Sequence, residues 1–397
     1  MYITTKIRER IPEQMTFDQL FERMLSTDWT NYRESGKNPS NRRVYTRTWH
    51  CEVLPERIAA GISVTELTGI LRRFNSVYAT LHKDNIADHY TTFYIPKKTG
   101  GLREINQPDD YLSNALRELK RIFEEHFFAS HHSAAFAYVK GRSTKDAVRV
   151  HQRNESWWFL KTDLSGFFPS TSLDFVMRML GQIYPFALVV ADPDGKAELK
   201  RALSLCFLKG GLPMGTPISP MLTNLIMIPF DYELSKYLRS LYKPENNSDR
   251  RGRRFVYTRY ADDMHISCRI DFDWRAVQQE IRRIFRRFGA PYVMKAEKTH
   301  YGSRSGQNWM LGIMLNKDNK MTIGHKKKRQ FEAMLHNYIK DRAEGRGWEN
   351  GALFYMQGVI SYYRMVNEAE TNDVLRAYGE RHNLDIEKCV KDDLAAG

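Results

Sequence analysis

The sequence predicts an α+β protein in which antiparallel hairpins alternate with amphipathic helices. Apolar and polar residues alternate with period 2 around a turn in three stretches: 90–108, 255–268 and 309–323. Apolar residues recur at helical spacing in others, most clearly in 112–128, 274–288 and 325–342. We therefore expect antiparallel sheets backed by helices.

The composition points to a nucleic-acid partner in a reducing compartment. The 397 residues include 61 Lys and Arg against 47 Asp and Glu, a net charge of +14 in a chain that is 12% aromatic. The four cysteines stand far apart and form no CxxC pair, which favours a cytoplasmic protein over a disulfide or zinc scaffold. No apolar run approaches the ~18 residues of a membrane helix, so no membrane partner is expected.

Residues 1–88 are expected to form a helical N-terminal extension. Apolar residues fall at helical spacing in 15–25, and 63–78 has the pattern of a helix with Ser63 as its N-cap. Nothing in this segment specifies chemistry. A packing role is favoured, and RNA binding or contacts between copies of the chain are the alternatives.

The hairpin at 90–108 carries cations at its turn. Lys98 lies in the glycine-rich turn at 97–101, and Arg103 follows on the second strand. Cations on such a hairpin could clamp a triphosphate. The alternative is a solvated turn in which Lys serves solubility.

A second group of cations precedes a helix. Ser143 or Thr144 is expected to cap a helix that begins at Lys145, and Lys140 and Arg142 lie just ahead of it. The N-terminus of a helix favours phosphate groups, so Lys140 and Arg142 are candidates for contact with a nucleic-acid backbone.

An apolar strand at 157–160 runs into a single acid, Asp163. A carboxylate leaving the end of a buried strand is not needed for packing, so Asp163 is a candidate metal ligand. Five residues later, Phe168 could lie under the sugar of an incoming nucleotide and clash with a 2′-hydroxyl. The alternative for Phe168 is an ordinary place in the core.

The segment 209–224 is a rigid loop, rich in Gly and Pro, that opens a helix. Glycines such as Gly215 let the backbone approach a nucleotide or a base pair closely. Ser219 is expected to cap the following helix, with Pro220 at N1, the favoured position for Pro.

The hairpin at 255–268 has Asp262 and Asp263 side by side at its turn. Two adjacent carboxylates repel each other, and holding both near a half-buried sheet is costly unless a cation neutralises them. Mg²⁺ prefers carboxylate oxygens, so this pair and Asp163 indicate a phosphoryl-transfer metal site that only a folded sheet can assemble. The alternative is an ordinary turn, where Asp is common because it hydrogen-bonds the local backbone.

The last third of the sequence has helical patterns. Four cations crowd the start of the helix expected at 325–342: Lys326, Lys327, Lys328 and Arg329. Because cations at a helix N-terminus oppose the helix dipole, this cluster is expected to serve a phosphate ligand.

In this order, the motifs resemble those of bacterial reverse transcriptases, most closely the retron-like and abortive-infection (defence-associated) branches. The matching segments are IPKKTGGLREI at 95–105, AFAYVKGRST at 135–144, DLSGFF at 163–168, LPMGTPISPMLTN at 212–224 and YADD at 260–263. Three departures stand out in the sequence. Met214 replaces the usual Gln of the family, and Met310-Leu311-Gly312 stands where retron enzymes have Val-Thr-Gly. Asp146-Ala147 with His151 is the nearest stretch to the Asn-Ala-x-x-His element of retron enzymes, with a different spacing.

The resemblance implies a right-hand polymerase with three parts. These are the helical extension at 1–88, fingers and palm at 89–319, and a helical thumb with the C-terminal region at 320–397. The implied activity is RNA-directed DNA synthesis from deoxynucleoside triphosphates with two Mg²⁺ ions, Mn²⁺ being the alternative. The implied partners are an RNA template or non-coding RNA, the DNA product, and a second copy of the chain or an effector protein in anti-phage defence.

The resemblance also distributes roles among residues. The metal site comprises Asp163, Leu164, Asp262 and Asp263, and Lys298 would protonate the pyrophosphate. The residues implied to contact the nucleotide or the template are Lys98, Arg103, Phe168, Met214, Gly215 and Tyr260. Three alternatives stay open: template-independent DNA synthesis at the same site, a retron enzyme making RNA-linked DNA, and a non-catalytic RNA-binding module.

Overall fold

The computed structural model describes residues 1–7, 45–52, 61–97, 100–241, 255–306 and 308–396. The chain divides into two compact units, each made of three segments. The first unit comprises Met1–Val139, Leu164–Tyr237 and Gln278–Val293, and the second comprises Lys140–Asp163, Leu238–Val277 and Met294–Gly397. The domain boundaries expected after residues 88 and 319 stay a prediction.

The first unit begins with a pair of strands that the sequence did not indicate. β1 (Tyr2–Ile7) and β2 (Tyr45–His50) pair antiparallel, so the extension is not helical throughout. These strands are short and rich in Thr, and β2 ends a polar, basic stretch, so no apolar alternation marked them. The helix expected at 15–25 lies outside the described residues.

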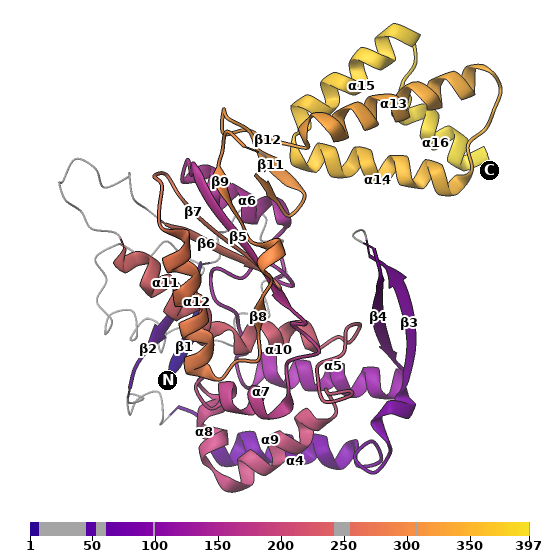
Figure 1. Ribbon diagram of the computed structural model, residues 1–397. Helices are drawn as coiled ribbons and strands as arrows, with labels where there is room; N and C mark the ends of the chain where they lie inside the picture. Colours follow the sequence, from indigo (N-terminus) through magenta and orange to yellow (C-terminus); the bar gives the residue numbers. More distant parts are fainter. Residues whose placement is uncertain (8–44, 53–60, 98–99, 242–254, 307, 397) are drawn as a thin grey trace. The chain divides into compact units, whose positions relative to one another are not determined.

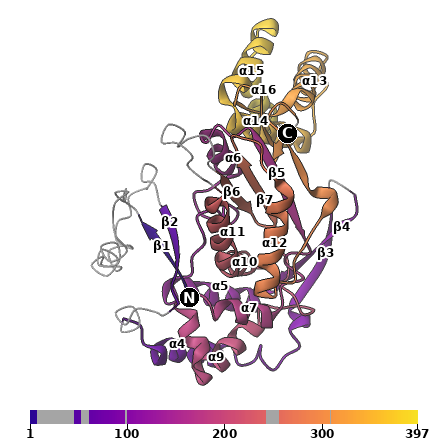
Figure 2. The same ribbon diagram turned by 60° about the vertical axis from the view of Figure 1, so that its left-hand side comes forward.

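Most of the first unit is helical, as Figures 1 and 2 show. Its helices are α4 (Val64–Val77), α5 (Asp110–Glu125), α7 (Leu173–Leu180), α8 (Phe186–Ala191), α9 (Pro193–Ser204) and α10 (Ser219–Ile226). Ser63 caps α4 as predicted, because its hydroxyl accepts a 3.1 Å hydrogen bond from the Glu66 N–H. A short 3-10 turn, η1 (Ile86–His89), leads into the predicted hairpin of β3 (Tyr90–Pro96) and β4 (Leu102–Pro108).

The second unit contains most of a five-stranded sheet, in which four strands follow one another in order and the fifth, β9, pairs with β5. The strands are β5 (Trp158–Ser165), β6 (Val256–Tyr260), β7 (Asp263–Cys268), β8 (Val293–Met294) and β9 (His300–Ser303). Their order is β6-β7-β5-β8, with β9 paired to β5, and β5 is antiparallel to both β7 and β9. α6 (Thr144–Arg153) packs against β6 and is capped by Ser143, as predicted. α11 (Ile228–Ser240), α12 (Trp274–Phe288) and the strands β5 and β8 have residues in both units.

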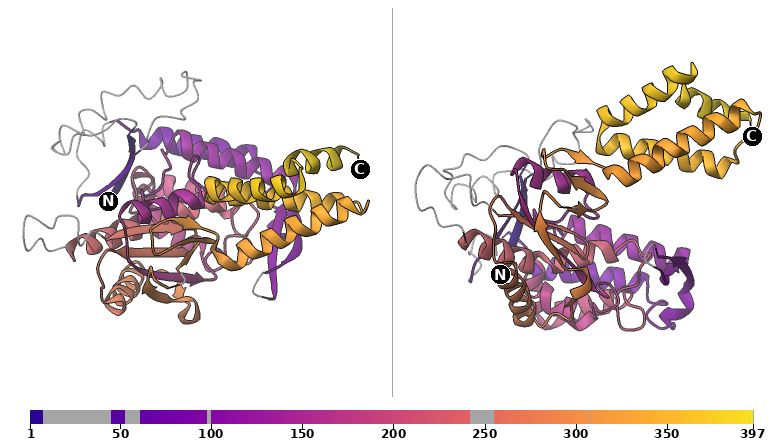
Figure 3. Two further views of the ribbon diagram at one scale, coloured as in Figure 1. Left: turned by 90° about the horizontal axis from the view of Figure 1, so that it is seen from above. Right: turned by 45° about the horizontal axis from the view of Figure 1, so that its top comes forward.

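The second unit ends in a small sheet and four helices, drawn from two further directions in Figure 3. The sheet consists of β10 (Trp309–Met310), β11 (Ile313–Leu315) and β12 (Met321–Thr322). The helices are α13 (Gly324–Ala343), α14 (Asn350–Val366), α15 (Glu368–His382) and α16 (Ile386–Ala396). One hydrophobic core joins this small sheet to the helices. The predicted α+β class is therefore confirmed, and no described helix is long and apolar enough to cross a membrane.

Candidate active site

The acidic turn lies where the sequence predicted it, between two paired strands. Tyr260 at the end of β6 pairs with Asp263 at the start of β7, which leaves Ala261 and Asp262 as the two turn residues. Ala261 has a left-handed φ of +56°, which is uncommon for a residue with a Cβ. The turn thus holds Asp262 and Asp263 at the end of a hairpin whose next residue, Met264, is fully buried.

β5 brings the third acid to the same end of the sheet. Asp163 is the cross-strand partner of Asp263, and its residue is only 4% exposed. Antiparallel partners have Cβ atoms about 4.5–5.5 Å apart, so the two carboxylates are neighbours. Leu164, next on β5, is fully buried.

Three lysines of the second unit compensate these acids. The Asp163 carboxylate has Lys295 Nζ 3.0 Å from Oδ1 and Lys298 Nζ 3.0 Å from Oδ2. Lys161 on β5 lies 4.0 Å from Asp263 Oδ1. Lys298 lies in η2 (Ala296–Lys298), the 3-10 turn between β8 and β9. The sequence singled out Lys298 but not Lys295, although both fall within one turn of the same segment.

Burial and mutual repulsion make the ionised state of the acidic turn costly. Burial, and after it the charge of Asp163, raises the pKa of Asp262 to about 6. Burial also raises the pKa of Asp263, while Lys161 opposes that shift. The hydrogen bond to Asp163 raises the pKa of Lys298. The acids therefore favour a cation beside them.

The donor set fits Mg²⁺, which takes hard oxygen ligands. Three carboxylates meet at one end of the sheet, and the buried Asp163 Oδ1 makes no hydrogen bond although an ammonium group lies 3.0 Å away. As the side chains stand, no three His, Cys, Asp or Glu of the described ranges converge on one metal position. Sharing an ion would therefore require Asp163 to turn from its lysines.

Arg259, which was not predicted as a site residue, contacts the backbone of the acidic turn. Its side chain is fully buried, and Nη1 donates a 3.2 Å hydrogen bond to the Ala261 carbonyl. Burying a guanidinium group is costly unless it is hydrogen-bonded, so this contact fixes the backbone of the turn. An arginine in the middle of a buried strand was the available signal in the sequence.

A buried hydrogen-bond network ties β6 and β7 to α6. His151 Nδ1 lies 2.6 Å from Ser267 Oγ, and its Nε2 lies 2.8 Å from Thr258 Oγ1. The Ser267 hydroxyl donates in turn to Ser156 Oγ at 2.7 Å. Burial lowers the pKa of His151 to about 3, so the ring is neutral at physiological pH.

The residues expected to meet the nucleotide lie mostly in the first unit. Asn106 on β4 donates its N–H to the Met214 carbonyl at 2.8 Å, which joins the β3–β4 hairpin to the Gly/Pro loop at 209–224. Gly215 has φ +112°, and a Cβ there would come within 2.9 Å of the Asn106 carbonyl. Arg103 is exposed on β4, and Lys98 lies outside the described residues.

Phe168 is half-buried in the same unit. Its ring meets that of Tyr138 edge-on at 6.3 Å, and its carbonyl accepts a hydrogen bond from the Leu212 N–H at 3.1 Å. The expected N-cap role of Ser219 is wrong, because Ile218 occupies the cap position. Ser219 instead donates its N–H to the Thr216 hydroxyl.

The cations predicted to bind phosphate differ in their exposure to solvent and in their partners within the protein. Lys326 and Arg329 are exposed at the start of α13, and Lys140 is exposed before α6, where Arg142 is half-buried. Lys327 donates to the Gly312 carbonyl at 3.1 Å and lies over the Trp309 ring. Lys328 pairs with Glu370 at 3.2 Å. Lys327 and Lys328 therefore both have partners within the protein.

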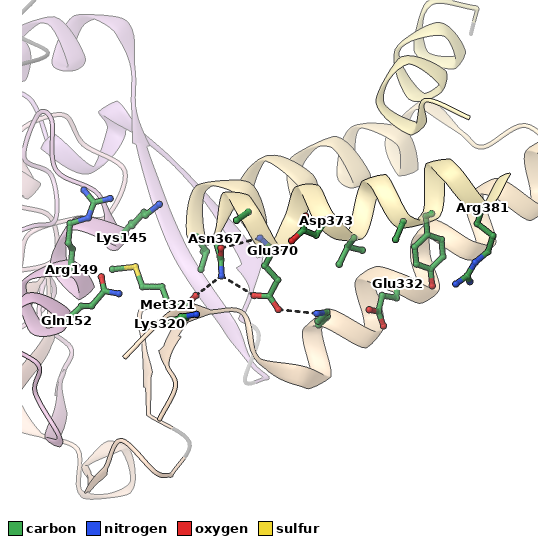
Figure 4. A pocket seen from close by; sticks show the side chains of 16 residues that line it. Lys145, Arg149, Gln152, Lys320, Met321, Glu332, Asn367, Glu370, Asp373 and Arg381 are labelled. Atoms are coloured by element: carbon green, nitrogen blue, oxygen red, sulfur yellow. Dashed lines mark hydrogen bonds and ion pairs between the residues drawn. The ribbon is translucent and has the colours of Figure 1, made fainter. Parts of the chain in front are cut away.

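Lys328 lines a groove of ≈ 920 Å³ within the second unit. Figure 4 shows Lys145 and Arg149 of α6 on one side and Glu370, Asp373 and Arg381 of α15 on the other. The residues that line the groove carry charges of both signs, so its charge alone does not select a nucleic acid over another ligand.

Comparison with known proteins decides the family. Residues 95–331 match the family model described as reverse transcriptase (RNA-dependent DNA polymerase). The chain belongs to the reverse transcriptase family. As a member of it, the protein is an RNA-directed DNA polymerase with a polymerase-like α+β fold, and the resemblance seen in the sequence is confirmed.

Curated relatives place this reverse transcriptase among retron-like bacterial enzymes. It is 28% identical over 320 residues to the retron Ec83 reverse transcriptase of Escherichia coli, covering 78% of this chain and 94% of that one. It is 26% identical over 383 residues to the retron Mx65 reverse transcriptase of Myxococcus xanthus, covering 93% and 81%. The retron Ec73 reverse transcriptase of E. coli is 26% identical over 252 residues, covering 62% and 72%.

Proposed function

We propose that this reverse transcriptase copies a non-coding RNA into DNA at the sheet end formed by Asp163, Asp262 and Asp263. The observation that carries this proposal is the strand register, in which Asp163 faces Asp263 beside the acidic turn. Because the curated relatives are retron reverse transcriptases, we extend the proposal to a dedicated RNA template and to a DNA product that stays linked to RNA. A role in anti-phage defence, with an effector protein or a second copy of the chain, belongs to the same proposal.

The metal site would comprise the three aspartates and Leu164. Two Mg²⁺ ions, or Mn²⁺ in their place, supply activation of the primer 3′-hydroxyl and stabilisation of the leaving oxygen when bound. Lys298 would give a proton to the departing pyrophosphate, and its 3.0 Å hydrogen bond to Asp163 Oδ2 supports this assignment.

Residues of the fingers hairpin and the Gly/Pro loop would hold the nucleotide. Lys98 and Arg103 contact the triphosphate, and Phe168 excludes the 2′-hydroxyl of a ribonucleotide. The remaining contacts with nucleotide or template fall to Met214, Gly215 and Tyr260. Lys140, Arg142 and the cations Lys326–Arg329 contact nucleic-acid phosphates, the exposed Lys326 and Arg329 foremost.

Primer extension on an RNA template tests this proposal. The wild type should incorporate all four deoxynucleotides as the template dictates, and a double variant, Asp262→Ala with Asp263→Ala, should incorporate none while still binding RNA. Equal activity in that variant would end the proposal. A non-catalytic RNA-binding module would show no incorporation by the wild type either.

Two further assays separate the remaining alternatives. Single deoxynucleotides supplied without RNA should not be polymerised, and untemplated products would favour template-independent synthesis. Sequencing the nucleic acid that co-purifies with the wild type should return one RNA species joined to complementary DNA. Recovery of unrelated cellular RNAs without DNA would contradict a retron-type template.

A further inference from the structure

Both oxygens of the Asp163 carboxylate face an ammonium group. Lys295 Nζ lies 3.0 Å from Oδ1 and Lys298 Nζ lies 3.0 Å from Oδ2, while the carboxylate side chain is only 6% exposed. A buried carboxylate without a counter-ion would be strongly destabilising, so the ion pairs with the two lysines stabilise Asp163 in its place in the sheet.

Lys295 is the more firmly held of the two lysines. Its main-chain N–H donates a 3.0 Å hydrogen bond to the carbonyl of Asp163 itself, so the backbone fixes this lysine beside its acid. Its side chain is 27% exposed, against 47% for Lys298. Lys298 lies three residues later in η2, whose repeat of three residues per turn places both ammonium groups on one side.

The charges of the three acids and three lysines cancel. Lys295 and Lys298 face Asp163, and Lys161 faces Asp263. A divalent ion that approached Asp163 with both lysines in place would meet two like charges within a few ångströms. Occupation of the carboxylate by a metal and by Lys295 is therefore competitive.

We propose that Lys295 is a built-in counter-ion of Asp163 that is exchanged for the metal. In the metal-free protein its ion pair holds the Asp163 side chain in place, and it leaves Oδ1 when a divalent ion binds. Lys295 is thus a positioning residue that lowers the affinity of the site for metal. This inference rests on the proposed role of Asp163 as a metal ligand.

Manganese binding to the full chain, without nucleotide or nucleic acid, tests the exchange. Loss of the free Mn²⁺ signal in electron paramagnetic resonance gives the dissociation constant for wild type, Lys295→Met, Asp163→Asn and a control, Lys317→Met. Lys317 is exposed in the turn between β11 and β12, so the control removes the same charge away from the acids. Lys295→Met should bind Mn²⁺ at least about tenfold more tightly, and the control should stay within about twofold of wild type.

The same titration distinguishes a failure of the Lys295 exchange from a failure of Asp163 as a metal ligand. If Asp163→Asn weakens Mn²⁺ binding but Lys295→Met does not tighten it, the exchange is refuted and the metal site stands. If Asp163→Asn leaves binding unchanged, Asp163 is not a ligand, and both ideas fail together.

Thermal denaturation gives a second readout that a general packing role would not produce. Without metal, Lys295→Met should melt below wild type, because it leaves the buried Asp163 carboxylate with one ammonium partner instead of two, and saturating Mn²⁺ should remove most of that difference. A deficit that persists at saturating Mn²⁺ would assign Lys295 to packing and overturn the exchange. Lys295→Gln, which also removes the charge, provides the same comparison if the Met variant does not fold.

Discussion

At the residue scale, we assign to Phe168 the selection of deoxyribonucleotides over ribonucleotides. Its half-buried ring packs edge-on against Tyr138, so truncation removes surface at the expected sugar position without opening the deep core. Phe168→Ala should raise the incorporation of ribonucleotides relative to deoxynucleotides by about 10- to 100-fold. The measurement is the ratio of kcat/KM for a matched pair of nucleotides, and an unchanged ratio would remove the role assigned to Phe168.

The buried His151 should make the free energy of unfolding, rather than catalysis, depend on pH. Burial lowers its folded-state pKa to about 3, whereas the unfolded chain has the ordinary value of 6.5. Between these values the unfolded state binds one more proton than the folded state, so stability falls as the pH falls. From pH 7.5 to 5.5 this single group should cost about 1.4 kcal/mol.

Urea denaturation of wild type and His151→Gln at both pH values measures this contribution. The variant should be less stable at pH 7.5, because Gln cannot reproduce both hydrogen bonds, yet it should lose about 1.4 kcal/mol less than wild type on acidification. His265, also fully buried with a lowered pKa, adds a slope of the same sign to both proteins. Equal losses in the two proteins would show that His151 titrates normally in the folded state.

At the scale of elements, the Gly/Pro loop and β4 depend on each other. Ala at position 215 would have to adopt φ +112° and would place its Cβ 2.9 Å from the Asn106 carbonyl. Gly215→Ala should therefore destabilise the protein by about 1–3 kcal/mol and raise the KM for nucleotides by displacing the β3–β4 hairpin. Gly69→Ala in α4 is the matched control, since its Cβ meets only the end of Arg73 at 4.0 Å. Equal stability and KM in both variants would contradict the contact.

Elements with a strong period were predictable from the sequence, and elements set by distant partners were not. The hairpins at 90–108 and 255–268 and the helix Trp274–Phe288 followed from local alternation and helical spacing. β1 and β2 are polar and pair across a long separation in sequence, so nothing local marked them. Thr216, rather than Ser219, accepts the hydrogen bond at the start of α10, because the loop sets which hydroxyl faces which N–H.

At the scale of the whole molecule, the order of the motifs revealed the family and the acids, but not their neighbours. Asp163, Asp262 and Asp263 stood out because carboxylates are rarely placed at the ends of apolar strands. Lys295 did not, because a lysine in a loop has no pattern of its own, and the strand position that marks Arg259 as unusual does not reveal its partner. Their positions beside Asp163 and beneath Ala261 depend on strand pairing between segments far apart in the sequence.

Asp163, remote in the sequence, is expected to act together with the acidic turn in the chemical step. Asp163→Asn keeps the shape of the side chain and removes its charge, so RNA binding should persist while the rate of the chemical step falls. The direct measurement is single-turnover incorporation of one deoxynucleotide on a primed RNA template at saturating Mg²⁺, with RNA affinity measured in parallel. We predict a rate at least about a thousandfold below wild type with RNA affinity unchanged. A rate within about threefold of wild type, a difference in barrier below 1 kcal/mol, would contradict the account.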